Sequence, residues 1–490
     1  MFSRQRRKIQ DEGDEGKIMD VEDAINEVGV GSMHWVVYIV VGLITAADSV
    51  EIGFIAYVTE CLEMKWDLSE NHKSMMESMI FAGQLIGSPF WGIVADKFGR
   101  RPAFLVSSAW ISFFGYCSAL SPNATCLIII RFFVGIGVAG ECVAFDIFAE
   151  MLPDNARGKL TLSTFYWWTF GTLYTTFAAW LTLANFGWRW FTAMCALPTT
   201  IALVVGFFAV PESAHWLCSI GDEEGAADVV NQVCTWNGVD LRYKKLTEPK
   251  VLDEVETKDL IKRSKLRRPL MLMSVVWLGF GIAYYGVALM VPHLFSHHKT
   301  AETPDAAAAE VAAAGQMCKA VSFSFGKILV GNFGQLIGLT LGVMTIDWLG
   351  RRMVQQLSYS ISAIFTIGLG FLSLGESALT IFSTVALSAQ MCSSCCTWTH
   401  TPELFPTKVR VLATGLCSSA ARIGAGMAPY LISNYIPPLP TALIMSAASV
   451  TAAIAVSFVR ETAHAPIDDE DEVLSSDGET ESAGEDEDLE

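Results

Sequence analysis

Twelve long apolar runs alternate with short polar segments along most of the chain. Each run is about 20 residues long, the length that a helix needs to cross about 30 Å of hydrocarbon. The runs lack the alternation of apolar and polar residues that marks a membrane β-strand. They begin near Trp35, Met75, Pro102, Ala124, Leu160, Trp190, Pro269, Ile328, Met353, Ala378, Val411 and Pro440. The pattern predicts an all-α membrane protein with twelve transmembrane helices.

The composition favours the same class. Of the 490 residues, 52% are hydrophobic and 17% are charged, whereas soluble domains average about 25% charged. The net charge of −18 disfavours nucleic-acid binding. The last 23 residues hold 13 carboxylates and no Lys or Arg, so we expect a disordered acidic tail. Because no phosphate-binding loop, nucleophile–base pair or metal-ligand set is visible, we expect no enzyme, no cofactor and no direct ATP drive.

An even number of spans places both termini on one side of the membrane. Under this assignment the tails and inward loops carry 25 of the 33 Lys and Arg residues, so the termini are predicted to be cytoplasmic. We expect a monomeric multi-pass protein of the plasma membrane or a vesicle membrane. Its parts are a cytoplasmic tail (1–33), a six-helix half (34–211), a cytoplasmic central loop (212–268), a second six-helix half (269–460) and the acidic tail (461–490).

The chain contains an internal repeat. Four short patches recur in the same order, at offsets of 249 to 253 residues. They are residues 83–87 and 334–338, 96–101 and 347–352, 150–157 and 403–410, and 212–215 and 461–464. Two six-helix halves of parallel topology are therefore predicted, a design typical of transporters that bind substrate near the middle of the membrane.

These motifs carry a family resemblance from about Val21 to Thr462. The loop 92–101 resembles the signature loop between helices 2 and 3 of the major facilitator superfamily. The segments 46–51, 402–410 and 421–424 are similar to synaptic vesicle glycoproteins and the related organic-ion (metabolite:proton) transporter branch. The resemblance implies pseudo-symmetric halves and a gating role for residues in the signature loops. These residues are Gly92, Asp96, Gly99, Arg100, Arg101, Glu150, Arg157, Asp347, Gly350, Arg351, Arg352, Glu403 and Arg410.

Two carboxylates stand inside the first apolar run. Asp48 and Glu51 are three residues apart and therefore share one helical face. A carboxylate at this depth costs at least about 2.5 kcal/mol, so it should face a cavity or a partner. The functional interpretation is reversible protonation coupled to transport, because burial disfavours the charged form. The alternative is a structural hydrogen-bond pair that holds the first helix against a neighbour.

Other polar groups within spans are further candidates for a substrate or proton site. Arg131 and Glu141 lie in the fourth span and could form a substrate or proton path, or pair with the first helix for packing. Arg422 is the single cation of its span, and it could hold a substrate carboxylate or pair within its own half. Substrate-lining aromatic side chains are expected at Tyr166, Trp167 and Tyr174, with packing and membrane-interface anchoring as the alternative.

The leading hypothesis for function is secondary active transport of a small organic ion by alternating access, coupled to protons. The partners would be the lipid bilayer, the organic ion and protons. The alternative is a non-transporting vesicle or membrane scaffold, or a receptor-like protein of the same fold. Such a protein would be expected to lose the buried charges, which this chain keeps.

Overall fold

The structure is a computed structural model, and it describes residues 17–247, 264–298, 318, 321–405, 407–432 and 436–463. The chain divides into two compact units. Unit 1 comprises Met1–Phe54 and Gly83–Leu252, and unit 2 comprises Ile55–Ala82 and Asp253–Glu490. The long helices α3 (Ser32–Trp66) and α4 (Glu70–Phe98) contribute residues to both units. The domain boundaries expected above stay a prediction, and most of the acidic tail (464–490) lies outside the described residues.

Unit 1 is a helical bundle with a core formed by the first half of α3, the second half of α4 and the helices that follow them. Buried Val37, Ile44 and Trp91 pack in this core against Phe104 and Phe148. The other elements of the unit are β1 (Lys17–Asp20), α2 (Val21–Val28), α5 (Arg100–Ala119), α6 (Ala124–Val138), α7 (Glu141–Met151), α8 (Asp154–Ser163), α9 (Phe165–Thr182), α10 (Trp188–Cys195), α11 (Leu197–Ala209), α12 (Ala214–Ser219), α13 (Glu223–Asn237) and β2 (Tyr243–Thr247).

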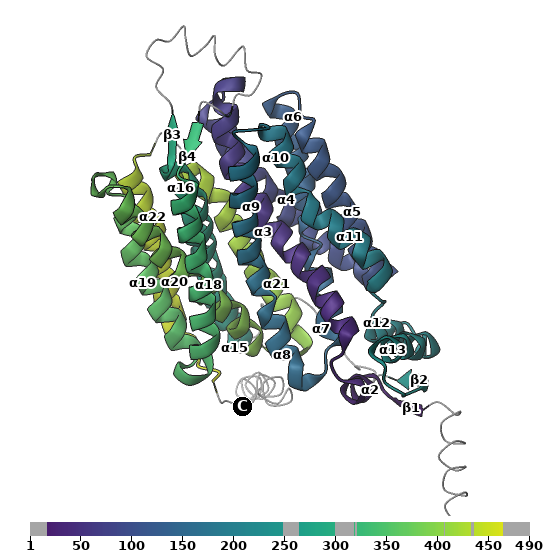
Figure 1. Cartoon of the computed structure of the whole chain (residues 1–490). Helices are drawn as coiled ribbons and strands as arrows, with labels where there is room; N and C mark the ends of the chain where they lie inside the picture. The colour runs from purple at the N-terminus through teal and green to yellow at the C-terminus, as the bar shows by residue number, and fades with distance from the viewer. Residues whose placement is uncertain are drawn as a thin grey trace, which may run out of the picture. The chain divides into compact units, whose positions relative to one another are not determined.

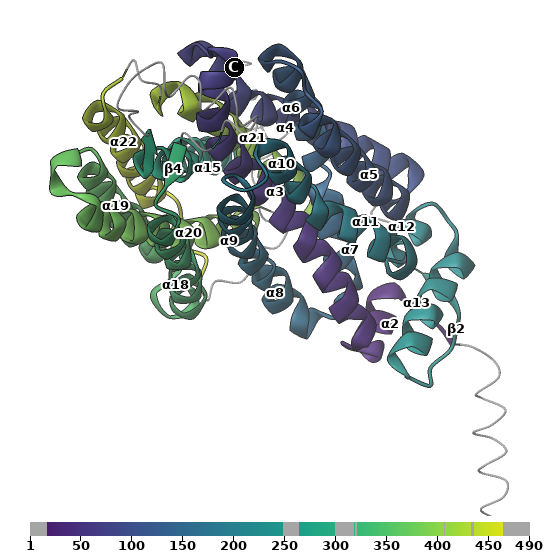
Figure 2. The ribbon, with the colours of Figure 1, turned by 45° about the horizontal axis from the view of Figure 1, so that its top comes forward.

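Unit 2 is a second bundle, in which α20 packs against α18 and α19, and α22 packs against α15 and α19 (Figures 1 and 2). Two short strands pair antiparallel at one end of the unit, with Ser296 opposite Phe323. Its elements besides parts of α3 and α4 are α15 (Ser264–Phe280), the π-helix η1 (Gly281–Tyr285), α16 (Gly286–Leu294), β3 (Ser296–His298), β4 (Val321–Phe323), α18 (Phe325–Leu349), α19 (Arg351–Leu369), the short 3₁₀ helix η3 (Leu372–Leu374), α20 (Glu376–Glu403), α21 (Thr407–Ile432) and α22 (Pro438–Ser457).

Each of the twelve predicted spans is helical in the structure. Among the described residues, eight helical stretches are long and apolar enough to cross a membrane: Ser32–Glu63, Glu70–Phe98, Ala124–Met151, Trp188–Ala209, Lys265–Leu294, Phe325–Leu349, Glu376–Glu403 and Pro438–Ser457. The other four spans correspond to α5, α9, α19 and α21, which carry more polar residues. The all-α membrane fold is therefore confirmed.

A small module outside the spans joins the N-terminal tail to the central loop, where the sequence indicated no regular structure. Strand β1 pairs parallel with β2, and α2 packs with α12 and α13 (Figure 1). Asp222 caps the start of α13 by accepting a hydrogen bond from the Gly225 N–H, and Gly238 ends it in a left-handed conformation. Apolar positions at helical spacing on α13, such as Ala226 and Val230, are buried in the module.

Candidate functional site

A buried polar centre lies about halfway along α3, within unit 1. Asp48 and Glu51 lie one helical turn apart, and their residues are only 1% and 3% exposed. The Gln84 amide on α4 donates a hydrogen bond to Asp48 Oδ1 over 2.7 Å. Gln84 is itself fully buried. The two carboxylates therefore share a helix face, as the spacing predicted, and face protein.

Arg131 on α6 pairs with the second of these carboxylates. Its guanidinium forms an ion pair and hydrogen bond with Glu51, and a further hydrogen bond with Ser118 on α5. The guanidinium also lies over the Phe54 ring, 4.7 Å from the ring centroid. Arg131 is only 1% exposed, so removing either partner of the pair would leave a buried charge without compensation.

Two polar atoms of this centre lack a hydrogen-bond partner among the described residues. They are Gln84 Oε1, an acceptor next to Asp48, and Arg131 Nε, a donor next to Glu51. Buried polar groups are nearly always hydrogen-bonded, so a buried donor or acceptor without a hydrogen bond needs a physical explanation. An acceptor beside a carboxylate can accept a hydrogen bond from the N–H of a cationic ligand or from a protonated acid.

The other predicted residues of unit 1 lie in different surroundings. Glu141 begins α7, just beyond the break in the fourth span. Trp167 packs edge-on to Tyr38 with ring centroids 6.1 Å apart, and the Tyr174 hydroxyl donates to the Met194 carbonyl over 2.7 Å. The contacts of these two aromatic residues favour the packing alternative, and a substrate-lining role for them or for half-buried Tyr166 stays a prediction.

Arg422 lies in unit 2 and has a polar neighbour that the sequence analysis did not identify. Its guanidinium donates to the Tyr285 hydroxyl over 3.3 Å. The adjacent Tyr284 hydroxyl donates to Gln335 over 3.0 Å, and both tyrosines lie in the π-helix η1. Single-turn π-helices are frequent at functional sites. The internal repeat could have pointed to Gln335 in the sequence, because Gln335 occupies the position equivalent to Gln84 in the duplicated segment.

The signature loop of unit 1 forms a charged network at the start of α5. Arg100 pairs with Asp96 over 2.6 Å and lies 3.8 Å from the Glu150 carboxylate. The Arg101 N–H donates to Glu212 over 3.0 Å, so a carboxylate from the end of the sixth span caps α5. Predicted gating residues from two segments thus meet at one place, together with Glu212, which belongs to the repeated patch 212–215.

The second signature loop reproduces this network in unit 2. Arg351 pairs with Asp347 over 2.9 Å and with Glu403 over 3.1 Å. The N–H groups of Arg351 and Arg352 donate to Glu461. Burial alone would raise the pKa of Glu461, but backbone N–H hydrogen bonds, two of them from the start of α19, lower it below its usual value. Each repeated residue therefore has an equivalent partner in its own unit.

The arginine that ends each glutamate–proline–arginine patch also has the same local contact. Arg157 Nε donates to the Leu152 carbonyl over 3.2 Å, and Arg410 Nε donates to the Phe405 carbonyl over 3.3 Å. In both units the arginine side chain donates to the backbone carbonyl of the residue five positions before it. Arg157 additionally pairs with Glu22 on α2, at 2.8 Å.

Comparison with known proteins agrees with this duplicated architecture. Residues 34–474 match the family described as "Sugar (and other) transporter". The chain belongs to this family. It is 28% identical to the synaptic vesicle 2-related protein of Xenopus laevis, over 90% of this chain and 80% of that protein. It is 26% identical to organic cation/carnitine transporter 7 of Arabidopsis thaliana, over 84% of this chain and 87% of that protein.

The fold is also similar to solved structures. The xylose transporter XylE from E. coli, in a partially occluded inward-open conformation, has a TM-score of 0.66 at 19% identity, covering 88% of this chain and 99% of that one. This member of the sugar (and other) transporter family is therefore a multi-pass membrane transporter of the major facilitator superfamily, and it is not an enzyme. The superfamily predicted from the sequence is confirmed.

The signature networks of this family member depend on two glycines. Gly99 has a φ of 103° and Gly350 a φ of 86°, and a Cβ on either would overlap the carboxylate of Glu212 or Glu461. We expect Gly99→Ala to destabilise the protein by about 1–3 kcal/mol, because the backbone conformation is nearly exclusive to glycine. Gly92→Ala is the control, since an added Cβ there meets nothing within 4 Å. Thermal unfolding of the purified protein would measure both, and equal unfolding temperatures would contradict the prediction.

Proposed function

We propose that this protein is a secondary active transporter that moves a small organic cation by alternating access, in coupling with protons. The observation that carries the proposal is the buried Asp48–Gln84 contact, next to the Glu51–Arg131 ion pair. Intramembrane carboxylates are costly, and they commonly mark ion and proton pathways. The proposal assigns different roles to the two acids of α3.

Glu51 is proposed to serve structure, and Asp48 coupling. The Arg131 guanidinium forms a buried ion pair with Glu51, so this acid already has a fixed partner that holds α3 against α6. Asp48 accepts from an amide that carries both a donor and an acceptor. Such an amide can hydrogen-bond to Asp48 as a carboxylate or as a carboxylic acid. Asp48 can therefore lose and regain a proton while keeping one hydrogen bond to Gln84.

The same contact suits an organic cation. A cation that carries an N–H could pair with ionised Asp48 and donate to Gln84 Oε1, which lacks a partner among the described residues. A proton on Asp48 would remove the charge that attracts the cation. Proton and cation would then compete for one site, which produces exchange as the halves of the transporter rock.

The names of similar proteins support both parts of the proposal. A relative from Arabidopsis thaliana is named an organic cation/carnitine transporter. One similar solved structure is titled a proton:xylose symporter. We further propose that both termini are cytoplasmic, from the distribution of Lys and Arg, and that the protein resides in a vesicle or plasma membrane. Relatives named for the synaptic vesicle favour the vesicle.

Uptake into proteoliposomes tests the proposal. The purified protein would be reconstituted and offered a panel of labelled organic cations, organic carboxylates and sugars, with and without a pH difference. We expect at least one organic cation to accumulate only while the pH difference is present, and an ionophore that collapses the difference to release it. Accumulation of only neutral sugars or carboxylates, or accumulation that ignores the ionophore, would contradict the proposal.

A further inference from the structure

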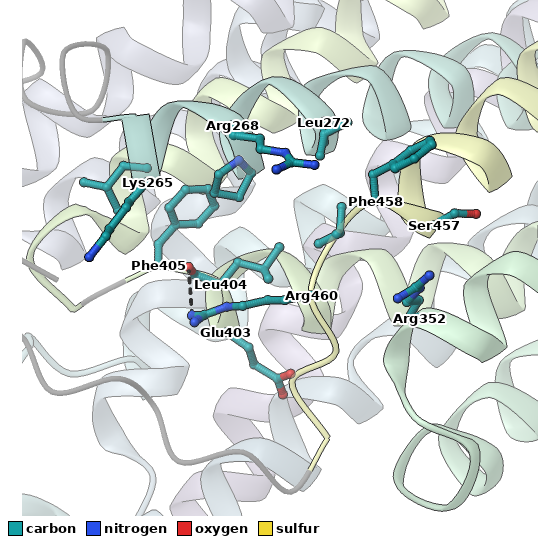
Figure 3. A pocket seen from close by; sticks show the side chains of 13 residues that line it. Lys265, Arg268, Leu272, Arg352, Glu403, Leu404, Phe405, Ser457, Phe458 and Arg460 are labelled. Atoms are coloured by element: carbon teal, nitrogen blue, oxygen red, sulfur yellow. Dashed lines mark hydrogen bonds between the residues drawn. The ribbon is translucent and has the colours of Figure 1, made fainter. Parts of the chain in front are cut away.

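A cavity of about 470 Å³ opens at the end of unit 2 that carries its signature loop (Figure 3). It lies between the start of α15, the start of α19, the end of α20 and the segment that follows α22. Its volume falls within the range of about 300–1,000 Å³ that is common for ligand pockets. The proposed transport centre is in unit 1, so the cavity contains none of the residues proposed above to bind the cation or the proton.

The cavity is lined by an excess of cations. Lys265, Arg268, Arg352 and Arg460 contribute positive side chains, and Glu403 is the one acidic residue among the described residues that line it. The side chains of Arg268 and Arg460 lie on opposite sides of the cavity in Figure 3. Lys265, Arg268 and Arg460 are solvent-exposed residues. The lining therefore presents a concentrated positive charge to the solvent.

The single acid of the lining does not offset this charge. The Glu403 carboxylate accepts hydrogen bonds from Arg351 at 3.1 Å and from the Thr462 hydroxyl at 2.5 Å. In Figure 3 this carboxylate is directed away from Arg268. Its charge is thus compensated by an arginine that does not line the cavity, whereas the four cations are part of the lining. Such a cluster attracts anionic groups.

The chain itself carries an acidic segment that is close in sequence to the cavity lining. Arg460 lines the cavity, and the described residues end at Ala463. Residues 468–472 are Asp-Asp-Glu-Asp-Glu, five consecutive carboxylates that begin eight residues after Arg460. Eight residues can span at most about 26–29 Å. That reach exceeds what is needed for the acidic run to return to a cavity whose wall includes Arg460.

We propose that the acidic segment 468–472 binds in this cavity as an intramolecular ligand of Lys265, Arg268, Arg352 and Arg460. The charges are opposite in sign, with five carboxylates against four cations, and the short connection gives the segment a high effective concentration. Carboxylates of the segment would form ion pairs with the arginine and lysine side chains of the lining. Anionic lipid headgroups are the competing occupant, because they also pair with clusters of basic side chains.

Zero-length carbodiimide crosslinking of the full-length protein tests the proposal. The reagent joins a carboxylate to an amine in direct contact, and Lys265 provides that amine within the cavity. In nanodiscs of phosphatidylcholine, we expect mass spectrometry to find residues 468–472 crosslinked to Lys265. Raising the salt from 0.05 M to about 1 M shortens the Debye length to about 3 Å and should lower the yield several-fold.

Matched variants separate the cavity from general attraction to positive charge. Arg268→Gln combined with Arg352→Gln should lower the crosslink yield by about threefold or more, since each exposed pair contributes up to about 1 kcal/mol, or fivefold. Arg267→Gln removes an exposed cation of the same helix that does not line the cavity, and it should leave the yield unchanged. The crosslink between Lys265 and the acidic segment is measured in the wild-type protein. That measurement remains informative if a variant fails to fold.

Three results would overturn the proposal. The first is the absence of a Lys265 crosslink in neutral nanodiscs when other lysines of the protein do react with the tail. The second is an equal yield in the Arg268/Arg352 variant and in the wild type. The third is a fall of the wild-type yield to the level of that variant when phosphatidylserine is added, which would make lipid the occupant in an anionic membrane.

Discussion

Replacing Asp48 with Asn is expected to abolish accumulation driven by a pH gradient and to weaken cation binding, because the variant can neither carry the transported proton nor present the charge that pairs with the cation. One pH unit is worth about 1.36 kcal/mol, so coupling one proton to one substrate can drive about tenfold accumulation. The Asn variant keeps the shape of the side chain and a partner for the Gln84 amide. It cannot take up a proton, so its accumulation ratio should stay near one.

Uptake of a transported cation into proteoliposomes with an imposed pH difference measures this effect. Ser49→Ala is the matched control, because it removes a buried polar group from the neighbouring position of α3 without changing charge. It should accumulate substrate as the wild type does. An Asn variant that still concentrates substrate with the gradient would show that Asp48 is not the coupling group.

The second large effect is expected at the Glu51–Arg131 pair, in stability. Glu51→Gln leaves the guanidinium of Arg131 buried without a countercharge. Breaking a buried ion pair by removing one partner costs about 3–5 kcal/mol, because the remaining charge stays desolvated. Arg131 is 1% exposed and its Nε already lacks a partner among the described residues. We therefore expect a clear fall in the thermal unfolding temperature of the purified protein.

A double-mutant cycle separates the pair from the individual side chains. Glu51→Gln with Arg131→Gln replaces two charges by two amides, so the double variant should be more stable than either single variant. Arg189→Gln removes an exposed cation of α10 and should change the free energy of unfolding by less than about 1 kcal/mol. Additive losses at positions 51 and 131 would mean that the ion pair does not couple the two helices.

The fold could be predicted from the sequence because its main signals are local. An apolar run of about 20 residues specifies a membrane helix by itself, since lipid offers no other way to satisfy the backbone. The internal repeat predicted the division into two halves. It also identified, for each residue of the first signature loop, the equivalent position in the second. Regular structure at α2 and α13 was missed, because short polar helices that depend on packing against one another leave a weak local pattern.

The candidate site was predicted less completely. The sequence marked Asp48, Glu51 and Arg131 because charges within apolar runs are conspicuous. It left open which acid pairs with Arg131, since residues 80 positions apart meet only when α3 and α6 pack together. The contribution of Gln84 was missed because a lone amide in a membrane helix looks like a packing residue until its neighbour is known.

The sequence alone thus determined the membrane class, the helical spans, the duplication and the identity of the buried charges, all of which follow from hydrophobicity and repetition along the chain. Only the tertiary structure decided the pairing of Glu51 with Arg131 and of Asp48 with Gln84. It likewise decided the capping of α5 and α19 by Glu212 and Glu461. The physical reason is that a charge within an apolar run is visible in the local sequence and requires a partner. Which residue becomes that partner depends on distances that helix packing sets.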